Sequence, residues 1–229
     1  MKSTYSSHHP QHEISFVKLH ELLKKHFNVG SWWPSSSQDE VLIGAVLTQN
    51  TNWNNVEKSL FNLSKNNLLS IENLSKSKIE IIQESIKSSG FYHQKAKYLK
   101  NISTNILENY GSLELFLKLD TEKLRKILLS FNGIGPETAD SILLYCGNKP
   151  SFVVDNYTKR ITQRVFGLTK LPSYSFIQNA VHREITPNVK IYKELHGELV
   201  ELAKNYCKKK PLCSACPLNN FCSYLALPT

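Results

Sequence analysis

The residues best suited to chemistry are four cysteines near the C-terminal end of the sequence. Cys207, Cys213, Cys216 and Cys222 fall within 16 residues, with the spacing C-x5-C-x2-C-x5-C. Four thiolates in one short segment can ligate a [4Fe–4S] cluster, which takes one cysteine per iron atom. Zinc also accepts four thiolates, although structural zinc sites more often pair two C-x2-C units and this segment contains one. The segment therefore predicts a [4Fe–4S] cluster, with zinc as the alternative. Two disulfides are the interpretation without a metal, and they are not expected in a reduced protein.

A glycine pair and an aspartate form a second candidate site. Gly133-Ile134-Gly135-Pro136 joins two predicted helices, and glycine permits a tight turn and close approach of the backbone to a ligand. Pro136 suits the first position of the second helix, whose free N–H groups favour a phosphate. The same pattern is also common in simple helix ends. Asp155 follows three apolar residues and precedes a predicted helix, where it can cap the helix or supply a carboxylate to a reaction.

The elements that would position these residues are helical. Apolar residues recur at helical spacing over 14–28, and the mostly apolar segment 40–48 is predicted to be a buried helix. Further helical patterns cover 53–64, 77–88, 92–109, 112–118, 122–130, 137–146, 156–166, 173–184 and 189–205. Alternating, strand-like runs are nearly absent, so the predicted fold class is all-α. Residues 1–12, rich in Ser, His and Pro, are predicted to be disordered, and Cys146 is expected to be a small core residue.

Charge and composition limit the function classes. The 229-residue chain has a formal net charge of +9, with 41% hydrophobic and 21% charged residues. These fractions are ordinary for a globular protein, and the positive excess favours a polyanion such as nucleic acid, although a basic protein without such a partner has the same numbers. No apolar run approaches the roughly 20 residues that cross a bilayer. We therefore expect no membrane partner, and a location in the cytoplasm, associated with the nucleoid in a bacterium. The cysteines are then expected to be reduced. We also expect the protein to be a monomer.

Together these motifs resemble the helix–hairpin–helix (HhH-GPD) DNA glycosylases of the endonuclease III group. The segment 131–139, FNGIGPETA, is similar to the family's L-P-G-V-G-x-K-T-A hairpin, and Val154-Asp155 to the V-D-T that follows it. The cysteine segment is similar to the family's C-x6-C-x2-C-x5-C, with a first interval one residue shorter. Residues 42–51 resemble its buried helix and glutamine turn, and 89–96 its G-x-Y-x-x-K-A loop. The resemblance spans about 30–222 of the sequence.

The resemblance implies a two-lobed fold. A six-helix barrel lobe of residues 36–149 would face a second lobe of 13–35 plus 150–229, which carries the iron–sulfur cluster loop. Double-stranded DNA with a damaged base would lie between the lobes, and the damaged nucleotide would be flipped out of the stack. The residues implied to contact DNA are Gln49, Gly90, Phe91, Tyr92, His93, Gly133, Ile134 and Gly135. Without the family, Gln49 could be a solvent-facing helix end and Tyr92 a half-buried aromatic residue.

The resemblance also implies a base excision reaction. Asp155 occupies the position of the catalytic carboxylate, which stabilises positive charge on the deoxyribose and orients or deprotonates the attacking water. Members that also cut the strand carry a hairpin lysine that forms a Schiff base, and here that position is Glu137. A monofunctional glycosylase without AP-lyase activity is therefore expected. Lys159 is an alternative nucleophile, and Glu137 also suits a first helical turn, where an acid complements the helix dipole.

Two features concern the damaged base. The adenine-mismatch branch carries a glutamate four residues before the glutamine, where this chain has Ala45. Trp32-Trp33-Pro34 and Trp53 resemble the aromatic base pocket of the 3-methyladenine branch, in which cationic 3-methyladenine would gain about 0.5–2 kcal/mol by stacking. The tryptophans could instead pack the core. We expect an alkylated purine such as 3-methyladenine, with a glycosylase for oxidised pyrimidines and a non-catalytic DNA-binding module as alternatives.

Overall fold

The structure, a computed structural model, describes residues 14–30, 33 and 35–226, and every regular element within them is helical. The α-helices are α1 (Phe16–Leu23), α2 (Gln38–Leu47), α3 (Trp53–Lys65), α4 (Ile71–Lys76), α5 (Ile79–Ser85), α6 (Tyr92–Tyr110), α7 (Leu113–Leu117), α8 (Thr121–Ser130), α9 (Pro136–Ser141), α10 (Asn156–Val165), α11 (Tyr174–Glu184) and α12 (Val189–Asn205). Short 3-10 turns are η1 (Lys87–Ser89), η3 (Cys213–Ala215) and η4 (Ser223–Ala226), and η2 (Ile142–Cys146) is a π-helical turn. The predicted all-α class is confirmed.

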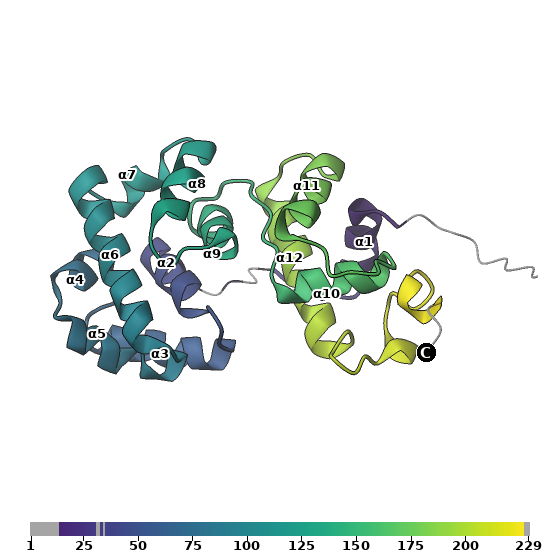
Figure 1. The fold of residues 1–229 in the computed structure, drawn as a ribbon, viewed down its shortest axis with the longest axis horizontal. Helices are drawn as coiled ribbons and strands as arrows, with labels where there is room; N and C mark the ends of the chain where they lie inside the picture. The colour runs from purple at the N-terminus through teal and green to yellow at the C-terminus, as the bar shows by residue number, and fades with distance from the viewer. Residues whose placement is uncertain (1–13, 31–32, 34, 227–229) are drawn as a thin grey trace, which may run out of the picture.

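Helices α2 to α9 gather in one lobe (Figure 1). Their centre is α2, in which every residue from 41 to 47 is buried. A helix that is apolar on all sides must be surrounded by other elements, and α2 packs against α3, α6, α9 and η2. The predicted buried helix at 40–48 is therefore confirmed, and it carries Gln49 just beyond its C-terminal end.

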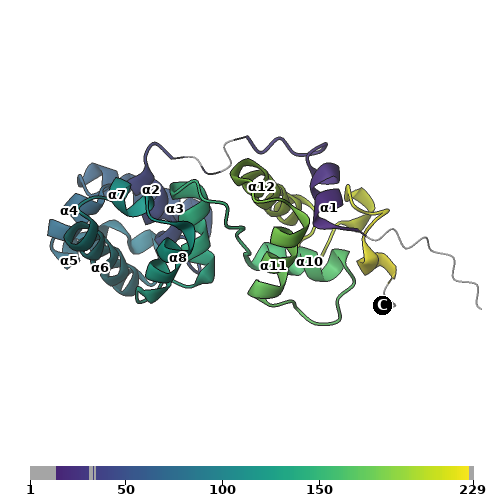
Figure 2. The same cartoon turned by 90° about the horizontal axis from the view of Figure 1, so that it is seen from above.

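The second lobe combines the two ends of the chain, since α1 packs against α11 and α12 (Figures 1 and 2). The ring of Phe16 lies 5.0 Å from that of Phe166, and His20 Nδ1 lies 2.8 Å from the buried Glu198 carboxylate. Both contacts join segments more than a hundred residues apart. The boundaries proposed for the domains, 36–149 and 13–35 plus 150–229, stay a prediction, because packing alone does not test whether each lobe folds as a unit.

The carboxylate of Asp140, in α9, holds the two lobes together. It is fully buried and accepts two hydrogen bonds from Arg125 of α8, at 2.7 and 2.9 Å. It accepts further hydrogen bonds from Ser151 in the connecting segment and from Tyr174 and Gln178 of α11, at 2.6, 2.7 and 2.9 Å. A buried charge is stable only when it is fully paired in this way, so these contacts fix α11 against α8 and α9.

Three local features differ from the predicted helices. Helix α1 ends at Leu23 instead of continuing to residue 28, and the predicted helix 137–146 becomes a π turn after Ser141. Helix α4 was not predicted, because six residues give less than two turns of periodicity. Its first backbone N–H, at Ile71, donates to the Asp39 carboxylate at 2.7 Å. The predicted disorder of residues 1–12 lies outside the described residues. No helix among those described is long and apolar enough to cross a membrane.

Candidate active site

The glycine turn between α8 and α9 has the geometry that its sequence predicts. Gly133 has φ +84°, and a Cβ at this position would lie 2.2 Å from the ring of Tyr98, so only glycine fits. Ile134 is buried and anchors the turn, and Gly135 caps α9 with Pro136 at its first position. The turn therefore exposes backbone at Gly135 while its middle residue is fixed in the core.

Gln49 joins this turn to α2. Its side-chain amide donates hydrogen bonds to the Gly133 carbonyl oxygen at 2.9 Å and to Thr138 Oγ1 at 3.0 Å. The interpretation of Gln49 as a solvent-facing helix end is therefore wrong for this structure. Its predicted contact with DNA stays a prediction.

The loop 90–93 lies at the start of α6 in a constrained conformation. Gly90 has φ +67°, and Phe91 has φ +47°, a left-handed conformation that is costly for a residue with a side chain. Phe91 is 71% exposed. The ring of Tyr92, which is half-buried, lies 4.2 Å from that of His93. A strained backbone that presents a large apolar side chain to solvent suits contact with another molecule.

Lys95 fixes this loop to the end of α2. The side chain is 2% exposed, and its Nζ donates to the carbonyl oxygens of Leu47 at 2.8 Å and Ser89 at 2.7 Å. Burial lowers the pKa of Lys95 to about 8. The two segments predicted to contact DNA, around Gln49 and Phe91, are thus held by one ammonium group.

Asp155 caps α10, and only one of its oxygens is used to do so. Oδ1 accepts the Thr158 backbone N–H at 2.7 Å, while Oδ2 lies 3.8 Å from Nε2 of the buried His196. The side chain is 17% exposed. The capping interpretation is therefore correct for Oδ1. It leaves the second oxygen of the same carboxylate available for chemistry.

Glu137, in the first turn of α9, lies close enough to Asp155 for the two charges to interact. Desolvation and then repulsion from Asp155 raise the pKa of Glu137 to about 7, and the nearby Lys159 opposes the shift. Near neutral pH the carboxyl group of Glu137 is therefore partly protonated, which reduces its repulsion of Asp155. The hairpin and the N-terminus of α10 bring the two acidic residues of the sequence motifs to one place.

The aromatic residues form a group beside α2. The ring of Trp33 lies 5.4 Å from that of Trp53, edge to face, and 5.0 Å from that of Tyr145, a residue of the π turn η2. Trp33 and Trp53 are each half-buried. Trp32 and Pro34, which were predicted to line a base pocket, lie outside the described residues. The group contains aromatic faces from three separate segments, which is a composition suited either to packing or to a flat ligand.

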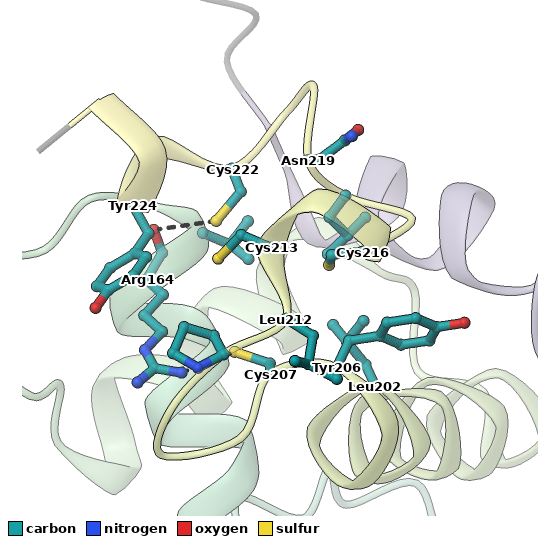
Figure 3. A pocket seen from close by; sticks show the side chains of 13 residues that line it. Arg164, Leu202, Tyr206, Cys207, Leu212, Cys213, Cys216, Asn219, Cys222 and Tyr224 are labelled. Carbon is teal, nitrogen blue, oxygen red and sulfur yellow. Dashed lines mark hydrogen bonds between the residues drawn. The ribbon is translucent and has the colours of Figure 1, made fainter.

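The four cysteines of the C-terminal segment surround one hollow at the edge of the second lobe (Figure 3). The hollow has about 380 Å³ of empty space, part of it open to solvent, and all four thiols are free. Arg164 of α10 donates to Cys207 Sγ at 3.3 Å and to the carbonyl oxygens of Lys208 and Lys209. Among the described residues, no three His, Cys, Asp or Glu side chains are arranged to hold a single metal ion.

A family model described as the HhH-GPD superfamily base excision DNA repair protein matches residues 43–187, which include the second half of α2, the glycine turn, Glu137 and Asp155. The chain belongs to this superfamily. It is 42% identical, over 90% of its length and 94% of the relative's, to a Methanocaldococcus jannaschii protein provisionally named a DNA repair glycosylase. It is 32% identical to endonuclease III of Thermotoga maritima, over 80% and 82% of the two chains.

A solved structure gives a third comparison within the HhH-GPD superfamily. The H. pylori 3-methyladenine DNA glycosylase bound to 1,N6-ethenoadenine superimposes with a TM-score of 0.73 at 30% identity, covering 83% of this chain and 98% of the other. The predicted HhH-GPD membership is thus confirmed, and a DNA glycosylase of base excision repair is supported. The individual roles of the site residues stay predictions.

Two residues of this HhH-GPD chain were missed as contributors to the site, because their partners are distant in the sequence. Lys95 appeared only as a letter in a loop motif, although its ammonium group contacts Leu47, which lies 48 residues away in the chain. His196, opposite Asp155, comes from α12 in the other lobe. A sequence signal existed for His196: in a long predicted helix it lies next to Leu195 and three residues before Leu199, so it is placed near the apolar face of that helix.

Proposed function

We propose that the chain is a monofunctional DNA glycosylase of base excision repair. It hydrolyses the N-glycosidic bond of a flipped, damaged base in double-stranded DNA and leaves an abasic site. The observation that carries the proposal is the proximity of Asp155 to Glu137 in the helix–hairpin–helix motif. One of these residues is the carboxylate that the reaction needs, and the other stands where strand-cutting members of the family have their Schiff-base lysine.

The proposed reaction follows from the position of Asp155. The bond between C1′ and the base nitrogen breaks, its electron pair leaves with the base, and positive charge builds on the deoxyribose. The Asp155 carboxylate, held at the N-terminal end of α10, stabilises that charge and accepts the proton of the water that attacks C1′. Glu137 cannot form an imine with the sugar, so the reaction ends at the abasic site.

The aromatic group favours an alkylated purine such as 3-methyladenine. This base is cationic, and it gains about 0.5–2 kcal/mol when it stacks on electron-rich faces such as those of Trp33 and Trp53. It also leaves as a neutral base, so no acid has to protonate it. The 30% identity to a 3-methyladenine glycosylase is consistent with this substrate.

The DNA-contacting segments are proposed from their exposure and their mutual fixation. Gln49 and the exposed Phe91 would fill the space that the flipped nucleotide leaves. Backbone N–H groups of the glycine turn would contact a phosphate, and the net charge of +9 would attract the DNA. The exposed lysines 208–210 either add phosphate contacts or form a solvated loop.

We propose that the cysteine hollow holds a [4Fe–4S] cluster, with one zinc ion as the alternative. Four thiols line the hollow, and a cluster gives each thiolate its own iron. When bound, such a cluster would supply four covalent cross-links to a segment that has little regular structure. The guanidinium of Arg164 would then donate to one ligand sulfur and hold the loop that follows it.

A second candidate is a glycosylase for oxidised pyrimidines with weak lyase activity. The 32% identity to an endonuclease III favours it, and Lys159, close to Glu137, could serve as the nucleophile. This candidate predicts strand nicking, which the first does not.

The experiment uses purified protein with methylated DNA, which contains 3-methyladenine, and with duplexes that each hold one 1,N6-ethenoadenine or one oxidised pyrimidine. Base release and strand nicking are scored separately, before and after alkali. Release of alkylated purines with nicking only after alkali is the expected result. Nicking without alkali on the oxidised pyrimidine, abolished by Lys159→Ala, would replace the proposal with the second candidate. No release from any duplex would refute both.

A further inference from the structure

Two buried polar side chains beside Asp155 have no part in the proposed reaction. Tyr145 is 8% exposed and His196 is 4% exposed, and the Tyr145 hydroxyl lies 2.7 Å from His196 Nδ1. The other ring nitrogen, His196 Nε2, lies 3.8 Å from Asp155 Oδ2. The three residues come from the π turn η2, helix α12 and the start of α10, so the series crosses from one lobe to the other. π turns are rare and often occur at functional sites.

We propose that Tyr145 and His196 are positioning residues that orient the Asp155 carboxylate and connect it to the aromatic group around Trp33. This inference rests on the proposed function, in which Asp155 is the catalytic carboxylate. It adds two residues that neither touch the sugar nor bind the base, and it gives the buried tyrosine a role beyond packing.

The chemistry of a neutral imidazole fixes the direction of the hydrogen bonds. Complete burial lowers the pKa of His196, so the ring is neutral near pH 7 and carries one N–H and one lone pair. A lone pair on Nε2 would face the Asp155 oxygen and be repelled by it. The hydrogen therefore belongs on Nε2, which points at Asp155, and Nδ1 accepts the hydrogen bond that the Tyr145 hydroxyl donates.

The series then acts on the orientation of the carboxylate. The Thr158 N–H holds Oδ1 at 2.7 Å, and His196 Nε2 lies 3.8 Å from Oδ2, so each oxygen has a fixed neighbour with partial positive charge. At 3.8 Å the second contact is electrostatic rather than a hydrogen bond, and such contacts tighten when a substrate completes the site. The Tyr145 hydroxyl polarises the imidazole and strengthens its N–H as a donor.

Tyr145 also links this series to the aromatic group. Its ring packs against Trp33 with the centroids 5.0 Å apart and the planes inclined by 36°, while its hydroxyl contacts His196. One residue thus contacts the proposed base pocket with its ring and the proposed catalytic carboxylate through its hydroxyl. The position of the pocket and the orientation of Asp155 are therefore coupled.

The test is Tyr145→Phe, which removes the hydroxyl and keeps the ring on Trp33. The matched control is Tyr192→Phe, because Tyr192 is also buried and its hydroxyl also makes a hydrogen bond. That hydroxyl donates to the Ile185 carbonyl oxygen at 3.1 Å, within the second lobe, and not to a residue that contacts Asp155. Single-turnover release is measured on the duplex that the wild type processes best, together with the DNA dissociation constant and the unfolding temperature. The expected result is release about tenfold slower in Tyr145→Phe, or about 1.4 kcal/mol, with unchanged DNA affinity. Tyr192→Phe should keep the wild-type rate of base release, while its unfolding temperature falls by about as much as that of Tyr145→Phe.

The double variant Tyr145→Phe/Asp155→Asn separates the possible failures. If Tyr145 acts through Asp155, the double variant is no slower than Asp155→Asn alone. Equal release by Tyr145→Phe and the wild type would overturn the inference and leave the proposed function intact, as would fully additive losses in the double variant. Wild-type release by Asp155→Asn would overturn the catalytic role of Asp155, and the inference with it.

Discussion

Asp140→Asn is predicted to destabilise the protein by about 2–4 kcal/mol. The change keeps the shape of the side chain but removes its charge and turns one oxygen into an NH2 group. Three of the hydrogen bonds to Asp140 end on Oδ2 and two on Oδ1, so either orientation of the amide leaves at least one Arg125 N–H without an acceptor. A hydrogen bond to a charged group contributes about 1.5–3 kcal/mol, and breaking a buried ion pair costs about 3–5 kcal/mol. Arg125 is 31% exposed, so water recovers part of this loss.

The assay is urea unfolding followed by circular dichroism and by tryptophan fluorescence, with Asp120→Asn as the control. Asp120 is an exposed cap of α8, and asparagine caps a helix as well as aspartate does, so this control should change the free energy of unfolding by less than about 0.5 kcal/mol. The fluorescence and circular dichroism transitions should shift together, because the network joins both lobes. A loss below about 1 kcal/mol for Asp140→Asn would refute the reasoning that the buried carboxylate fixes the lobes.

Glu137→Lys places an amine next to Asp155, so borohydride should trap a covalent complex of this variant with lesion-containing DNA. Neither the wild type nor Glu137→Gln should form such a complex. No trapped complex would show that the hairpin position alone does not determine lyase activity. The pKa of Glu137 is raised to about 7, by desolvation first and then by Asp155, with Lys159 opposing. Because the folded-state pKa lies above the unfolded value, the wild type gains stability relative to Glu137→Gln below about pH 4.5 and loses that gain as pH rises through about 7. Urea midpoints of both proteins at about pH 5 and pH 8 measure this difference, and a wild type that becomes relatively more stable at the higher pH would contradict it. Cys213→Ser should remove the absorbance near 400 nm of anaerobically purified protein, whereas Cys146→Ser, at a buried thiol remote from the hollow, should keep it; absorbance retained in Cys213→Ser would exclude the four-cysteine cluster.

Most of the helices could be predicted from the sequence, because the apolar periodicity and the turn residues that specify a helix lie within one short segment. The apolar run of α2 requires burial on every side. The turn requires φ +84° at position 133, a conformation that glycine adopts readily. Helix α4 escaped prediction because Ile71 and Leu74 supply a single apolar turn. Its start signal, Ser70, whose side chain accepts the Asn73 backbone N–H, was present in the sequence and could have been used.

The parts of the site that could not be predicted depend on contacts between distant segments. Lys95 is a lysine, a type that sequence patterns place on the surface, and only the convergence of the Leu47 and Ser89 carbonyl oxygens makes its burial favourable. Asp140 is likewise acceptable in the core only because Arg125 and Gln178 arrive from other helices. Periodicity in the sequence cannot represent such compensation, so buried charges are where sequence-based prediction fails.

The sequence offers two interpretations of Asp155, a helix cap and a catalytic carboxylate. The two are compatible, because the cap uses only one of the carboxylate oxygens. The cap orients the carboxylate through Oδ1 and leaves Oδ2 for the reaction. Asp155→Asn should therefore separate the two roles, because asparagine caps a helix equally well but carries no charge. We expect a free energy of unfolding within about 0.5 kcal/mol of the wild type, unchanged DNA binding and base release at least about a hundredfold slower. Loss of stability together with release would mean that the cap alone explains Asp155, and full release would overturn the catalytic role of its carboxylate.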